Sequence, residues 1–126
     1  MKKILFFLLA VTFGFVAQAQ NKAEIKFVTE EIDYGTIKQG ADGVRVFEFK
    51  NTGKAPLVIS GANSSCGCTV PSYPKDPIAP GATGKIEVKY DTQRVGAIAK
   101  TIMVTSNATD TPSVALRIKG KVEANN

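Results

Sequence analysis

The segment Lys85-Ile86-Glu87-Val88-Lys89-Tyr90-Asp91 decides the fold class, because apolar and charged side chains alternate along it without interruption. Side chains of a β-strand point to opposite faces with a period of two residues, so this segment predicts a strand with one buried and one solvated face. The same alternation recurs between Val114 and Val122. Antiparallel sheets that face water on one side show this pattern.

Other strand-like runs are separated by turn residues and cover residues 25–28, 32–37, 44–50, 56–62 and 96–106. In Val46-Phe47-Glu48-Phe49 the alternation breaks after Val46, which predicts a β-bulge. From residue 20 onward, no segment of ten or more residues carries the apolar spacing of a helix. The sequence therefore predicts an all-β fold, an immunoglobulin-like antiparallel β-sandwich of about seven strands. A small β-barrel has the same periodicity and is the alternative.

The predicted core consists of the apolar residues that point inward in this pattern, namely Phe47, Phe49, Leu57, Ile59, Ile86, Val88, Tyr90, Ile102, Val104, Leu116 and Ile118. Between two of the strands, Asn51-Thr52-Gly53 is typical of a turn in which the asparagine side chain bonds the backbone two residues on. We expect Gly53 to supply a positive φ there.

The N-terminal segment is predicted to be a cleavable signal peptide. Lys2 and Lys3 precede an apolar run over residues 4–16, and Ala17-Gln18-Ala19 has the small-x-small pattern that signal peptidase cleaves. This run is shorter than the roughly 20 residues of a membrane-spanning helix. We therefore expect residues 1–19 to be removed between Ala19 and Gln20, leaving one domain over residues 20–126. The protein would be exported, periplasmic or secreted, with no integral membrane segment after cleavage.

Composition excludes several classes of function. Without Lys2 and Lys3, 14 basic and 11 acidic residues remain, and both signs alternate along the strands, so no nucleic-acid partner is expected. The chain contains no histidine, which removes Ser/His/Asp and Cys/His nucleophilic sites as well as the commonest metal ligand. We predict that the protein is not an enzyme, has no catalytic residues and binds no cofactor.

Both cysteines, Cys66 and Cys68, flank Gly67 in Ser64-Ser65-Cys66-Gly67-Cys68-Thr69. In an extended strand their Cα atoms would lie about 6.6 Å apart, close to the upper limit for a disulfide, and a turn at Gly67 would shorten that distance. Closing so small a loop removes only about 1.6 kcal/mol of chain entropy from the unfolded state. A Cys66–Cys68 disulfide is therefore expected to be labile rather than stabilising.

Four interpretations of this pair remain open. The thiols could be small buried hydrophobes or an ordinary bridge. They could form a redox site that exchanges with partner disulfides. Cys66 and Cys68 are also candidate ligands for a soft metal such as Cu(I), with Met103 as a third ligand. The last interpretation is a disulfide to another molecule.

A series of short motifs resembles the bacterial family named domain of unknown function 1573. The matching motifs, in order over residues 27–122, are Ile32-Asp33-Tyr34-Gly35-Thr36-Ile37, Phe47-Glu48-Phe49-Lys50-Asn51-Thr52-Gly53, Pro56-Leu57-Val58-Ile59, Ser65-Cys66-Gly67-Cys68-Thr69, Ile78-Ala79-Pro80-Gly81 and Ser106-Asn107. The Cys-Gly-Cys-Thr element is the most specific of them. This resemblance implies an exported immunoglobulin-like domain of the ASPM/Hydin type and brings no established activity.

Two hypotheses of function follow from the sequence. The first is an exported, non-enzymatic module of the cell envelope that binds another envelope protein or has a structural role, with free strand edges available for β-addition. The alternative is a thiol-disulfide redox or copper-handling protein centred on Cys66 and Cys68.

Overall fold

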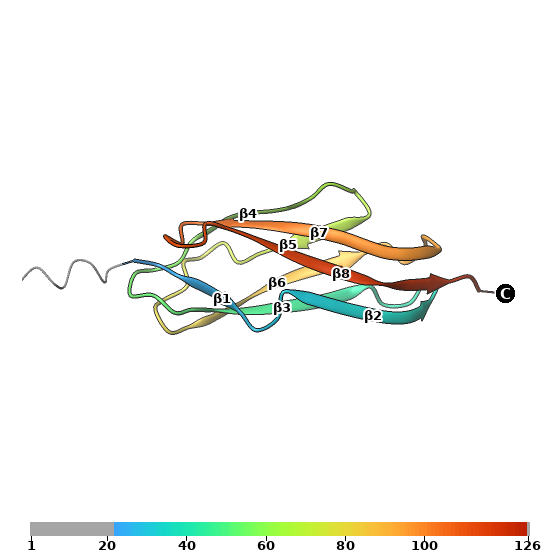
Figure 1. Cartoon of the computed structure of the whole chain (residues 1–126), viewed down its shortest axis with the longest axis horizontal. Coiled ribbons are helices and arrows are strands. Elements are labelled where there is room, and N and C mark those ends of the chain that lie inside the picture. The colour runs from blue at the N-terminus through green and yellow to red at the C-terminus, as the bar shows by residue number, and fades with distance from the viewer. Residues whose placement is uncertain (1–21, 126) are drawn as a thin grey trace, which may run out of the picture.

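The computed structural model describes residues 22–125, which form two four-stranded sheets packed face to face (Figure 1). The predicted signal peptide and its cleavage site between Ala19 and Gln20 lie outside the described residues. Within the described part of the chain, no helix has the length and apolar character needed to cross a membrane. The predicted all-β sandwich is confirmed.

Eight strands make up the sandwich: β1 (Ile25–Phe27), β2 (Glu31–Lys38), β3 (Val44–Asn51), β4 (Ile59–Ser64), β5 (Thr69–Ser72), β6 (Thr83–Tyr90), β7 (Gly96–Ser106) and β8 (Ser113–Glu123). Sheet A has the order β1-β3-β6-β5, and sheet B has the order β2-β8-β7-β4. Without β2, this is the strand arrangement of a constant-type immunoglobulin domain. The strand that the sequence analysis did not predict is β5, the short strand that follows the two cysteines.

The N-terminal strand passes from one sheet to the other. Its first part, β1, pairs antiparallel with β3 of sheet A, and its second part, β2, pairs parallel with β8 of sheet B. All other strand pairings are antiparallel. One continuous segment therefore contributes an edge strand to both sheets.

The core between the sheets agrees with the sequence prediction, since every predicted core residue is buried. Leu57 is fully buried although it lies outside the named strands, in an isolated bridge with Ile78. Burying a side chain of this size contributes about 1.5–3 kcal/mol relative to leaving it exposed. The alternating apolar positions thus supply the main stabilising term of the fold.

The predicted bulge at Val46 is wrong, because β3 pairs with β6 in unbroken register from Val44 to Lys50. Val46 simply faces solvent, with 42% of its surface exposed. Arg45 takes the inward phase instead, and its guanidinium lies 4.2 Å from the centroid of the Tyr34 ring. The apolar alternation breaks at this point because Val46 points outward, whereas the charged residue Arg45 points inward.

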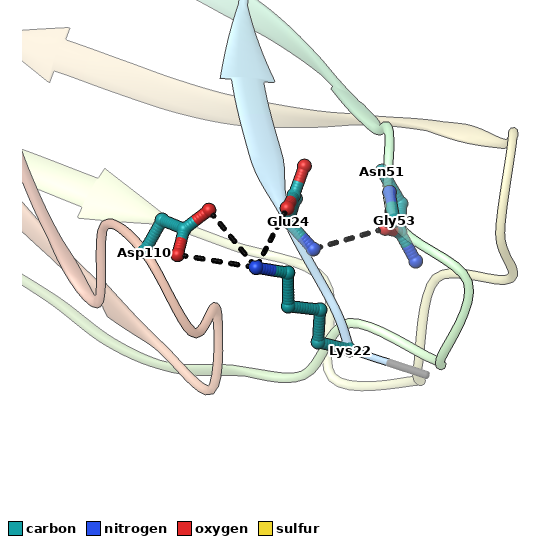
Figure 2. A network of polar contacts seen from close by, with 5 residues as sticks. All are labelled: Lys22, Glu24, Asn51, Gly53 and Asp110. Carbon is teal, nitrogen blue, oxygen red and sulfur yellow. Dashed lines mark hydrogen bonds and ion pairs between the residues drawn. The ribbon is translucent and has the colours of Figure 1, made fainter. Parts of the chain in front are cut away.

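Asn51, the last residue of β3, is fully buried and satisfies four backbone groups from three segments. Its Oδ1 accepts hydrogen bonds from the N–H groups of Gly53, at 2.9 Å, and Glu24, at 3.3 Å (Figure 2). Its Nδ2 donates to the carbonyl oxygens of Ala55, at 2.8 Å, and Ile78, at 2.9 Å. The predicted turn is therefore present, and the same side chain also fixes β1 and the segment before β6.

Gly53 has a different role from the predicted one, because its φ is not positive. A Cβ at this position would overlap the carbonyl oxygen of Lys22 and lie 2.7 Å from the nitrogen of Glu24. Lys22 is also held by its amine, which lies 3.4 Å from the Asp110 carboxylate and 3.7 Å from that of Glu24 (Figure 2). The glycine is needed here for close approach of two backbones.

We expect Asn51→Ala to lower the free energy of unfolding by about 3 kcal/mol or more, because it leaves buried backbone groups without partners. Urea denaturation followed by circular dichroism measures the change. Asn107→Ala is the matched control: Asn107 is exposed and bonds the N–H of Val58 and the carbonyl oxygen of Pro56, and water can replace its amide. Its expected loss is below about 1 kcal/mol, and equal losses in the two variants would contradict the role given to Asn51.

Candidate functional site

The two cysteines lie in the connection between β4 of sheet B and β5 of sheet A. Thr69, the first residue of β5, pairs with Tyr90 at the end of β6, whereas the start of β6 pairs with Lys50, next to Asn51. The cysteines are therefore at the opposite end of the sandwich from the Asn51 network. We call the segment of residues 65–68 the disulfide turn.

Cys66 and Cys68 form a disulfide, with their Cα atoms 5.2 Å apart. This distance is shorter than that of an extended strand, so the chain turns between the cysteines as predicted. The bridge occupies both sulfurs, and Met103 faces the outer side of sheet B while Cys68 packs in the core, so these three sulfurs do not converge. Among the described residues, no group of three or more His, Cys, Asp or Glu side chains is placed to hold a metal ion.

Hydrogen bonds that do not involve the S–S bond hold the disulfide turn in place. The N–H of Thr69 donates to the carbonyl oxygen of Cys66 at 3.2 Å, and the N–H of Asp91 donates to that of Cys68 at 2.8 Å. The N–H of Cys66 donates to the Ser64 hydroxyl at 3.3 Å. The turn is thus attached to its own strands and to the end of β6 through the backbone.

The surroundings of the two sulfurs are unequal. Cys68 is 4% exposed and belongs to the core, whereas Cys66 is half-buried and Gly67 is exposed. The Cys68 N–H donates to Cys66 Sγ at 3.2 Å, and Cys68 Sγ lies 3.5 Å from the Thr69 hydroxyl oxygen. Cys66 is therefore the more exposed residue of the pair, and Cys68 is enclosed with its sulfur beside a hydroxyl group.

Gly67 is not required by the local backbone. Its φ is not positive, and a Cβ added to it would meet no atom within 4 Å outside the two neighbouring cysteines. The turn between the cysteines therefore does not depend on the glycine, contrary to the expectation from spacing. Gly67 is exposed and adds no side-chain atoms beside the bridge.

Two buried tyrosines, Tyr34 and Tyr90, pack against each other near this end of the sandwich. The rings of Tyr34 and Tyr90 meet edge to face with centroids 6.2 Å apart, and the Tyr34 hydroxyl donates to the carbonyl oxygen of Gly43 at 2.8 Å. Burial raises the pKa of the Tyr34 hydroxyl above its ordinary value of 10.0, and the neighbouring Arg45 guanidinium acts in the opposite direction. Tyr34 is therefore neutral at physiological pH and serves as a hydrogen-bond donor.

The predicted free strand edges are partly covered. At the edge strand β5, Pro71 has no N–H to donate, and the N–H of Thr69 is already bonded to Cys66. At the edge strand β4, the Tyr73 hydroxyl donates to the carbonyl oxygen of Ser60 at 3.4 Å. β1 has three residues, which leaves β2 as the longest edge, with eight. These features are typical of edges protected against the addition of another strand.

Four valines lie instead among charged side chains on the outer side of sheet A. Val28, Val46 and Val70 are 76%, 42% and 59% exposed, and Val44 is partly exposed. The register aligns Val44 and Val70 on either side of Lys89, so they share one row across the sheet. We call these four residues the valine face.

The sequence profile of the family of proteins of unknown function DUF1573 matches residues 25–122. The chain belongs to this family. The resemblance drawn from the sequence motifs is confirmed, and the match includes both cysteines. Among curated proteins, none matches the chain. Membership of this family assigns no activity to the chain, because the family is one of unknown function.

Solved structures similar to this DUF1573 chain show the same fold. A protein of unknown function from Porphyromonas gingivalis W83 has a TM-score of 0.73 at 18% identity, covering 82% of this chain and 48% of that one. A PapD-like domain of human CEP192 has a TM-score of 0.68 at 11% identity, covering 83% and 89%. The Vibrio cholerae VesB protease has a TM-score of 0.61 at 15% identity, covering 84% and 33%. The chain spans about half the length of the first of these proteins and a third of the protease.

The raised pKa of Tyr34 predicts a loss of stability at alkaline pH. Above pH 10.0 Tyr34 ionises in the unfolded chain while it stays protonated in the folded one, so its contribution is complete below pH 10.0 and falls as the pH rises toward the folded value. Urea midpoints of wild type and Tyr34→Phe, measured from pH 8 to 11, test this. The stability difference between them should shrink with rising pH, and a constant difference would contradict it.

Gly67→Ala is expected to change the free energy of unfolding by less than about 0.5 kcal/mol, since the new methyl group meets open space. Gly84→Ala is the contrasting variant, because its Cβ would lie 2.5 Å from Cζ of the fully buried Phe49. Overpacking of this kind costs about 1–3 kcal/mol. Denaturation of both variants in urea tests the assignment, and a large loss for Gly67→Ala would show that the turn needs its glycine.

Proposed function

We propose that the chain is an exported, non-enzymatic immunoglobulin-like module that binds another protein of the cell envelope. The observation that carries this proposal is the valine face. Single exposed apolar residues are ordinary on protein surfaces, but a group of them on one side of a sheet is typical of an interaction site. Three of the four valines are more than 40% exposed; Val44, Val46 and Val70 lie in strands of sheet A, and Val28 directly follows β1.

The charges around the valine face indicate the chemistry of its partner. Two exposed acidic residues, Glu48 and Glu87, share the outer face of sheet A with four exposed lysines, Lys26, Lys50, Lys85 and Lys89. Within residues 22–125, none of these lysines lies within 4.0 Å of a carboxylate. A partner surface with apolar side chains bordered by carboxylates would complement this face.

Export supports a partner in the envelope. In this proposal residues 1–19 are a signal peptide that is cut between Ala19 and Gln20, and residues 20–126 are the single mature domain. The first buried side chain of the described chain is Ala23, at 3% exposure, and β1 starts at Ile25. Cleavage at the proposed position would therefore remove no strand of the sandwich, and the product would be periplasmic or secreted.

Site-specific photo-crosslinking in the source bacterium tests the proposal. A photoreactive residue in place of Val46 or Val70 should give one defined crosslinked product, whereas the same residue in place of Thr101, on the outer face of sheet B, should give several-fold less. Val46→Glu should reduce the crosslink formed from position 70, because it puts a charge into the apolar contact. Absence of a product at both valines, or equal products at Thr101, would refute the valine face as the binding surface.

A further inference from the structure

The S–S bond of the disulfide turn can open without unfolding the domain. It closes a loop of only three residues, and loops of this size restrict the unfolded chain least. The backbone bonds from Thr69 to Cys66 and from Asp91 to Cys68 attach the turn to the sandwich independently of the sulfurs. Reduction of the bridge therefore leaves the connection between β4 and β5 anchored.

The two cysteines of the bridge differ in their exposure to an attacking thiolate. Thiol-disulfide exchange proceeds by attack of a thiolate on one sulfur of the bond, and the sulfur that can be reached is attacked. Cys66 is half-buried beside the exposed Gly67, which carries no side chain to cover it, whereas Cys68 is 4% exposed. Cys66 is therefore the residue of the pair that an incoming thiolate reaches more readily.

The leaving sulfur is provided with a hydrogen-bond partner. When the S–S bond breaks, its electron pair goes to Cys68 Sγ, which lies 3.5 Å from the Thr69 hydroxyl oxygen. A hydroxyl that donates to a thiolate favours the charged form. The Cys68 N–H, 3.2 Å from Cys66 Sγ, holds the attacked sulfur in position.

An exposed apolar side chain follows the disulfide turn. Val70 comes two residues after Cys68 and is 59% exposed. It can provide apolar contact for a molecule that approaches the bridge.

From this arrangement we propose that the Cys66–Cys68 bridge is a thiol-disulfide exchange site that oxidises an external dithiol, with Cys66 as the attacked sulfur and Cys68 as the leaving group. The first thiolate of the dithiol forms a mixed disulfide with Cys66 and releases the Cys68 thiolate. Its second thiolate then attacks the dithiol's own sulfur in the mixed disulfide and releases Cys66. The dithiol becomes a disulfide, and its two protons and two electrons pass to the cysteines.

Single-cysteine variants test the direction of attack. Cys68→Ser keeps the Cys66 thiol, and we expect it to react with the disulfide reagent 5,5′-dithiobis(2-nitrobenzoate) at least tenfold faster than Cys66→Ser, which keeps the enclosed Cys68. In guanidinium chloride the two rates should become similar, because the difference comes from the fold. Equal or reversed rates in the folded proteins would overturn the assignment of Cys66.

The wild-type exported chain supplies a test that does not depend on folding of the variants. Dithiothreitol should reduce the bridge while the circular dichroism spectrum of the sandwich is retained. Glutathione trapped as a mixed disulfide by acid quenching should map to Cys66 by peptide mass spectrometry. A bridge that is reduced only in denaturant, or glutathione found on Cys68, would refute the exchange site and leave the proposed partner binding at the valine face unaffected.

Discussion

The buried amide of Asn51 is the constraint that brings β1, the end of β3 and the segment before β6 together at one end of the sandwich. It stands at the point where β3 ends, where the N-terminal segment enters sheet A and where the chain returns towards β6. All of its hydrogen-bonding capacity towards these segments is used, with two bonds accepted and two donated. A buried polar group is tolerated only when it is satisfied, so the three segments must meet in this one geometry.

The two ends of the sandwich are consequently built on different principles. Near Asn51, backbones approach so closely that Gly53 cannot carry a side chain, and Lys22 is held by ion pairs. At the disulfide end, Gly67 has open space around it and the chain is attached by a few backbone bonds. The end that contains Asn51 fixes the positions of several segments relative to one another. The end that contains the disulfide turn is more open to reaction or contact with other molecules.

The alternation of apolar residues was sufficient to predict the sandwich and its core, because a strand that is buried on one face has apolar residues at every second position. It could not reveal that β2 runs parallel to β8, since both kinds of pairing have the same period. β5 was missed because it has four residues and includes Pro71, which is tolerated there only because β5 is an edge strand. The cysteine pair was recognised from its spacing, but the unequal burial of Cys66 and Cys68 depends on how the connection sits between two sheets, and spacing carries no information about that.

The passage of the N-terminal strand from sheet A to sheet B determines how the domain responds to force. β8 is the last strand and β2 follows β1 at the start of the described chain; β2 and β8 run parallel, and β1 and the C-terminus lie at opposite ends of the sandwich (Figure 1). Tension between the two chain ends would slide β2 along β8 rather than peel them apart. The inter-strand bonds of this pair would then carry the load together, so the domain is built to resist stretching along its long axis.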